Sequence, residues 1–114
     1  MSIQLNTRQV GDVVVPDAAG RIVMGDPATK LRDTVCQLAE KGHKRVVLNL
    51  ADVAYIDCSG LGELIAAGST RVSQGEAVKL LNLTERVLTV FHMTKLHTVL
   101  PIFDNEQAAL TSLN

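Results

Sequence analysis

Aromatic residues are scarce in this chain: they make up 3% of its 114 residues, and tryptophan is absent. Clustered lysine or arginine is lacking as well, and the formal net charge is −1. Proteins that bind nucleic acids usually carry a clustered basic surface, with aromatic side chains interleaved where single strands are bound. We therefore expect no nucleic-acid partner and a core built from aliphatic side chains.

Long apolar runs are also missing. No segment approaches the roughly 20 apolar residues that a membrane-spanning helix needs, and the polar, alternating residues 1–8 do not resemble a signal peptide. Without a basic cluster, attraction to an anionic membrane surface is not expected either. The two cysteines, Cys36 and Cys58, form no Cys-x-x-Cys pair and indicate no disulfide framework. We expect a cytoplasmic protein that does not contact the membrane.

Motifs for metal, cofactor or nucleotide binding are not found. His43, His92 and His97 do not share the spacing of metal ligands, and no cluster of cysteine or acidic residues completes a site. Gly60 and Gly62 match part of a dinucleotide-binding pattern whose third glycine is missing. Walker A and Gly-x-Ser-x-Gly patterns are absent. We expect no metal and no cofactor, and we favour a binding module over an enzyme.

What is present is a globular composition, with 46% hydrophobic and 20% charged residues. A chain of this length fits one domain, which we assign to residues 1–114. Alternating residues 3–10, a Gly11-Asp12 turn and the valines that follow predict a β-hairpin. Residues 16–20, which include Pro16 and Gly20, predict a break before another extended segment at residues 21–24.

The rest of the chain alternates between helices and strands. Asp26 followed by Pro27 predicts a helix start with Asp26 as the N-cap, and Gly42 suits the end of that helix. Strands are predicted at residues 45–50, 77–83 and 97–100. Three further helix starts are predicted, at Asp57, Thr84 and Asp104.

This order predicts an α/β fold with parallel strands joined by right-handed crossovers. We expect a single domain with a four- to five-stranded mixed sheet, an antiparallel N-terminal hairpin and about four helices packed mainly on one face. The buried face of the helix after Asp57 is expected to extend to Val72. The core is expected to be contiguous and to include Val47, Leu48, Leu50, Leu61, Leu64, Ile65, Leu80 and Leu81.

The most informative segment is residues 53–64, where a strand and a short predicted loop lead to Asp57 and the start of a helix. Asp57 fits the rule for an N-cap residue better than the pattern of a catalytic carboxylate. A helix start presents free N–H groups and a partial positive charge, which favour an anion such as a phosphoryl group. Gly60 and Gly62 leave room for another backbone or protein surface to approach closely.

These residues resemble the signature of the STAS family, which is Asp-Ser-Ser/Thr-Gly-Leu-Gly at the head of a helix that follows a strand. The chain has Asp57-Cys58-Ser59-Gly60-Leu61-Gly62 at this place. The resemblance covers the whole chain and includes residues 20–22 and 78–83. Bacterial members of the family antagonise anti-sigma factors. The resemblance therefore implies an anti-sigma factor antagonist that regulates transcription by partner switching.

The resemblance also implies a phosphorylation switch. An anti-sigma factor with serine-kinase activity modifies the first hydroxyl after the aspartate, and the unmodified antagonist binds that kinase and frees the sigma factor. A phosphatase is the expected second partner. A phosphate adds about −1.5 to −2 charges at neutral pH, which would disturb a close protein contact. The implied partner-binding surface comprises Asp26, Asp57, Cys58, Ser59, Gly60, Leu61, Gly62 and Glu63.

The sequence departs from this pattern at the phosphoacceptor position, which holds Cys58; the hydroxyl lies one residue later, on Ser59. A helix rotates by about 100° per residue, so Ser59 points differently from the usual acceptor. Ser59 is the candidate phosphorylation site, with an ordinary solvated serine as the alternative. Where family members often carry an acid before the first helix, Asp26 is the candidate substitute.

Two other readings stay open at this point. The chain could be a STAS scaffold subunit of a stressosome-like or lipid-transport complex. Cys58 could instead be a redox sensor, because a helix start stabilises a thiolate; its alternative is a small residue that replaces serine without a redox task. None of these patterns indicates the oligomeric state.

Overall fold

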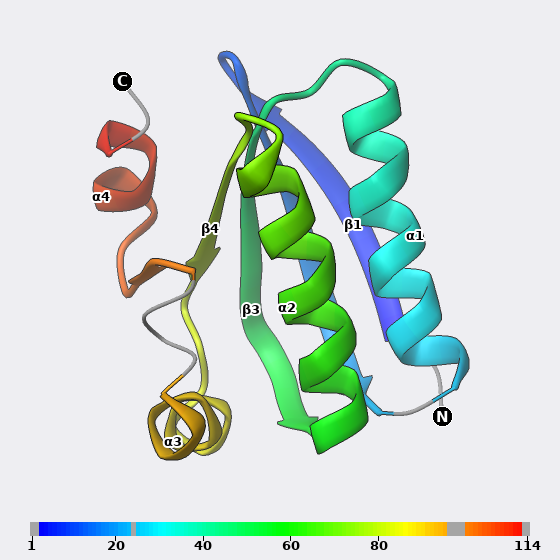
Figure 1. The fold of residues 1–114 in the computed structure, drawn as a ribbon. Coiled ribbons are helices and arrows are strands. Elements are labelled where there is room, and N and C mark those ends of the chain that lie inside the picture. Colours follow the sequence, from blue (N-terminus) through cyan, green and yellow to red (C-terminus); the bar gives the residue numbers. More distant parts are fainter. Residues whose placement is uncertain (1–2, 24, 96–99, 113–114) are drawn as a thin grey trace.

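Five strands form one mixed sheet in the computed structural model, which describes residues 3–23, 25–95 and 100–112, with the backbone alone for residues 26–28 and 58. β1 and β2 form an antiparallel hairpin, every later pairing is parallel, and the strands lie side by side in chain order (Figure 1). The predicted α/β fold is confirmed. The elements are β1 (Ile3–Val10), β2 (Val13–Ile22), α1 (Asp26–Glu40), β3 (Arg45–Ile56), α2 (Cys58–Ser73), β4 (Ala77–Leu81), α3 (Glu85–Thr94), β5 (Ile102–Phe103) and α4 (Glu106–Thr111).

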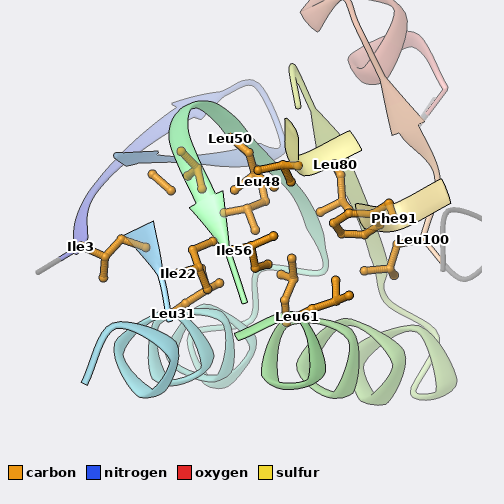
Figure 2. Packing of buried hydrophobic residues seen from close by; sticks show 14 of the residues in the cluster. Ile3, Ile22, Leu31, Leu48, Leu50, Ile56, Leu61, Leu80, Phe91 and Leu100 are labelled. Carbon is orange, nitrogen blue, oxygen red and sulfur yellow. The ribbon is translucent and has the colours of Figure 1, made fainter. Parts of the chain in front are cut away.

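The helices cover the two faces of the sheet unequally. α1 and α2 lie side by side over one face, where their side chains form the larger buried cluster together with those of the strands and with Val87 and Phe91 of α3 (Figures 1 and 2). On the other face, Ala109 of α4 is buried with Val47 and Leu81 in a smaller cluster. The prediction of one contiguous core was therefore wrong for Val47 and Leu81. Successive side chains of a strand point to opposite faces, so the sheet separates these two residues from Leu48 and Leu80.

A group of polar side chains links α4 to the hairpin. The Arg8 guanidinium donates hydrogen bonds to Asp17 on β2 and, at 2.8 Å, to Glu106 at the start of α4. Asn49 on β3 donates to the same Asp17 carboxylate at 2.7 Å. The bond from Arg8 keeps the pKa of Asp17 below its ordinary value and outweighs the opposite effect of partial burial.

β2 continues through the residues that were predicted to interrupt it. Pro16 lies within the strand and pairs with Thr7 of β1. The pairing with β3 shifts in register directly afterwards, between Asp17 and Ala19. Proline donates no hydrogen bond and is tolerated in a sheet next to such irregularities. The predicted break is thus a change of register within one strand.

Two helix ends were predicted correctly from the local sequence. Thr84 caps α3, since its Oγ1 accepts a hydrogen bond from the N–H of Val87. Gly42, with φ +87°, follows α1, and the N–H groups of Gly42 and His43 bond to carbonyls in the last turn of that helix. This arrangement requires a left-handed residue, which glycine supplies without steric cost.

Two other helix starts lie one residue away from the prediction. Gly25, not Asp26, is the N-cap of α1, and no side chain caps this helix. Asn105, not Asp104, caps α4 by accepting a hydrogen bond from the N–H of Ala108 at 3.2 Å. In each pair of neighbours, Gly25 with Asp26 and Asp104 with Asn105, both residues are of a type that caps helices. Which one becomes the cap depends on where the backbone turns into the helix.

Strand lengths also differ from the prediction. β3 continues to Ile56 and leads directly to Asp57, so the short loop expected there does not exist. β4 ends at Leu81 instead of residue 83. Most of the strand predicted at residues 97–100 falls outside the described residues, and β5 follows Pro101. On α2, Val72 is 45% exposed, contrary to the prediction, and Ile65 is half-buried.

Candidate functional site

Asp57 holds the junction between β3 and α2. Its Oδ1 accepts a hydrogen bond from the N–H of Gly60 at 2.6 Å, which confirms the predicted N-cap. Its backbone N–H donates to the carbonyl of Ile22 at the end of β2, at 3.1 Å. Asp57 therefore sets both where the helix begins and how closely it lies against β2.

Gly60 is buried at the point where α2 meets β2. A Cβ atom placed on Gly60 would lie 2.3 Å from the carbonyl oxygen of Ile22, far inside any real contact distance. The backbone that approaches Gly60 closely is thus the chain's own strand. The expected close approach of another backbone is therefore present at Gly60, and it serves the packing of the helix. A direct contact of Gly60 with a partner stays a prediction.

Gly62, in contrast, faces open space. It is exposed, and nothing lies within 4 Å of the position that a Cβ atom would take. Ser59 is exposed on the same side of the helix, and Glu63 is half-buried beside it. Leu61 points the other way and is 3% exposed, inside the larger core cluster. We call the outward face formed by Ser59, Gly62 and Glu63 the α2 surface.

An ion pair connects this surface to α1. The guanidinium of Arg32 donates from Nη1 to Oε2 of Glu63 at 3.0 Å. Nε of Arg32 also lies 3.8 Å from Oδ1 of Asp33, its neighbour on α1. Sequence reasoning missed Arg32. Neighbouring parallel strands indicate that α1 and α2 are adjacent, but no sequence pattern gives the rotation of one helix against the other.

A second pair that sequence reasoning did not predict, Arg21 and Tyr55, lies at the same end of the sheet. Arg21 of β2 is placed with its guanidinium carbon 5.0 Å from the ring centroid of Tyr55 on β3, a cation–π contact. The next residues, Ile22 and Ile56, point into the core under the helices. Strand side chains alternate, so Arg21 and Tyr55 lie on the sheet face opposite α2.

Two predicted site residues have side chains outside the described part of the structure. Cys58 is the first residue of α2 and Asp26 is the first residue of α1. Their backbones begin neighbouring helices that follow the neighbouring parallel strands β2 and β3. Both positions therefore lie at the end of the sheet where these two strands finish. Their roles stay predictions.

Among the residues that the structure describes, no three histidine, cysteine or acidic side chains are grouped to hold a metal ion. Within the same residues, no helix is both long and apolar enough to cross a membrane. A hollow of about 430 Å³ lies between α3 and β5, and residues 57–63 do not line it.

The sequence profile of the STAS domain matches residues 4–109 of the chain. The chain belongs to the STAS domain family. This confirms the resemblance seen in the signature segment. The STAS chain is 32% identical over 102 residues to the anti-sigma-B factor antagonist of Bacillus subtilis (strain 168), a match that covers 90% of this chain and 92% of that relative.

Solved structures share the fold of this STAS domain. An anti-sigma factor antagonist from Mycobacterium paratuberculosis has a TM-score of 0.86 at 21% identity, and the match covers 97% of this chain and 93% of the other. The Bacillus cell fate determinant SpoIIAA in its phosphorylated form has a TM-score of 0.72 at 17% identity, with 97% and 100% covered. At these identities the likeness concerns the fold.

The geometry divides the STAS signature of this chain into two groups. One group builds the junction of strand and helix: the Asp57 carboxylate bonds to the backbone of the helix start, and Gly60 and Leu61 are buried. Ser59 and Gly62 point outward to solvent. A signature that is continuous in sequence is therefore part structural support and part accessible surface.

Proposed function

We propose that this chain is an anti-sigma factor antagonist, a cytoplasmic regulator of transcription that binds an anti-sigma factor and so releases the sigma factor. The match to the antagonist of Bacillus subtilis carries this proposal, because it spans nearly the full length of both chains. We assign the activity to a single STAS domain over residues 1–114. It acts by binding and not by catalysis.

The partner is an anti-sigma factor with serine-kinase activity, and a phosphatase reverses the modification. The proposed contact is the α2 surface. It is extended by Asp57, Cys58 and Asp26, which follow the ends of β2 and β3. An exposed helix face with a glycine at its centre supports this choice, because a partner can approach the backbone closely there. Gly60 and Leu61 contribute by fixing the shape of that face.

Affinity purification from the native cell, followed by titration with the recovered protein, tests the proposal. A soluble ATP-binding anti-sigma factor that binds the purified chain is the expected result. Recovery of a membrane-transporter ATPase or a large oligomer would contradict it and indicate a scaffold subunit. A reversible oxidation of Cys58 that controls activity would indicate a redox sensor instead.

Gly62→Arg is expected to weaken binding of the anti-sigma factor by more than tenfold, or about 1.4 kcal/mol. The arginine side chain would occupy the space into which the partner fits, while the open surroundings of Gly62 leave the fold unaffected. Isothermal titration calorimetry measures the change. Thr70→Arg, an exposed position farther along the same helix, is the matched control and should bind like the wild type. Unchanged affinity of Gly62→Arg would move the interface elsewhere.

Phosphorylation is expected at Ser59 and is expected to be slow. Ser59 is exposed, but it lies about 100° around the helix from the usual acceptor, and a kinase must align the hydroxyl with its catalytic base. Kinase assays with mass spectrometry should show slow labelling of the wild type and none of Ser59→Ala. Cys58→Ser should be labelled fast at the new serine.

The kinase assay separates an antagonist that is regulated by phosphorylation from one that is always active. A wild type that binds the kinase but accepts no phosphate is a constitutive antagonist. Modification at Ser69 or Thr70 would show that the signature segment is not the regulated site.

A further inference from the structure

Ser59 and Glu63 are neighbours on the outer side of α2. They are four residues apart, which places their Cβ atoms about 5–6 Å from each other on a helix surface. Helical side chains lean toward the N-terminal end of their helix. We therefore expect the Glu63 carboxylate near the turn that contains Ser59, so that a group added to the exposed Ser59 enters its surroundings.

Arg32 reaches Glu63 from α1. Its Nη1 lies 3.0 Å from Oε2 of Glu63, so its guanidinium bridges the two helices that run side by side in Figure 1. The two side chains are 45% and 37% exposed. An exposed ion pair of this kind contributes at most about 1 kcal/mol. Arg32 can therefore exchange Glu63 for a stronger partner at little cost.

A phosphate is such a partner. It carries about −1.5 to −2 charges at neutral pH and three acceptor oxygens, and a guanidinium binds it through two parallel hydrogen bonds. Beside Glu63, the same phosphate repels the carboxylate, which favours the exchange. Two other acidic residues, Asp33 beside Arg32 and Asp57 at the start of α2, are the same before and after Ser59 is modified.

We propose that Arg32 is the receptor of a phosphate on Ser59, and that its guanidinium moves from the Glu63 carboxylate to the phosphate when Ser59 is modified. The inference rests on the proposed function, because it takes Ser59 as the modified residue. The exchange leaves Glu63 without its ion pair beside Gly62. The α2 surface then presents an added phosphate and an uncompensated carboxylate where it had a hydroxyl and a neutral pair.

The test uses the full chain with phosphoserine incorporated at position 59 during translation, so that it needs no kinase. A ³¹P chemical-shift titration measures the second pKa of the phosphate. A nearby guanidinium favours the dianion, so this pKa is expected to be about half a unit lower in the wild type than in Arg32→Gln. Arg45→Gln is the matched control, since Arg45 begins β3 at the end of the sheet opposite Asp57.

Arg45→Gln should titrate like the wild type, and Glu63→Gln should lower the phosphate pKa further by removing both the competitor and its charge. Identical curves for the wild type and Arg32→Gln would overturn the assignment. Failure of the kinase to label Ser59 would count against the proposed modification and not against this measurement. The two ideas can therefore fail separately.

Discussion

Gly60→Ala is expected to lose at least about 2 kcal/mol of unfolding free energy, whereas Gly62→Ala is expected to lose none. The new methyl group at position 60 would lie 2.3 Å from the carbonyl oxygen of Ile22 and 2.9 Å from its Cγ2. The oxygen belongs to the backbone of β2, so relief requires the helix to move away from the sheet. At position 62 the methyl group meets open space, and alanine is a better helix residue than glycine by up to about 1 kcal/mol.

Urea denaturation followed by far-ultraviolet circular dichroism measures both variants. Because each replaces a glycine of α2 by alanine, the helix-propensity gain is the same and the difference reports the contact with Ile22. Equal midpoints would contradict the close packing of α2 against β2. A stable Gly60→Ala variant would also leave room at Gly60 for a partner contact.

Leu64→Ala is expected to cost about 2–5 kcal/mol. Leu64 is 1% exposed and belongs to the larger cluster between α2 and the sheet. Removing its side chain leaves a cavity because the surrounding strands cannot close over it. Val72→Ala on the same helix is the control: Val72 is 45% exposed, and its replacement should change stability by no more than about 0.5 kcal/mol.

The midpoint of unfolding decides this prediction as well. A Leu64→Ala variant that unfolds with the wild type would mean that the rotation of α2 is wrong. The assignment of Ser59 and Gly62 to the outer face would then be wrong too, because one rotation fixes all these positions. The stability measurement is thus a test of the site that needs no partner protein.

The contrast between the two glycines bears on how the signature is understood. From the sequence, both glycines were expected to let another backbone or protein surface come close. In the folded chain, Gly60 allows the start of α2 to lie against the end of β2, and this contact places Gly62 and Ser59 where they are exposed. A loss of binding in a Gly60 variant would therefore reflect a displaced helix and not a lost contact.

Local sequence determined those features that depend on residues three or four positions apart. The caps at Asp57 and Thr84 and the left-handed Gly42 each bond within one turn of their helix, so residue type and spacing were enough to predict them. The alternation of hydrophobic runs gave the order of strands and helices, and the signature around Asp57 indicated the family. Neighbouring caps of similar chemistry, such as Asp104 and Asn105, could not be told apart.

Only the tertiary structure decided how distant segments meet. Pro16 stays in β2 because pairing with β1 and β3 holds the strand together across a change of register. The contact of Gly60 with Ile22 and the pairing of Arg32 with Glu63 each join residues more than thirty positions apart. The split of the core between two faces likewise depends on how distant segments pack. Such contacts depend on the rotation and depth at which each helix settles on the sheet, and packing of the whole core sets both. The side chains of the site belong to one short segment, but the shape of the site depends on the elements packed around that segment.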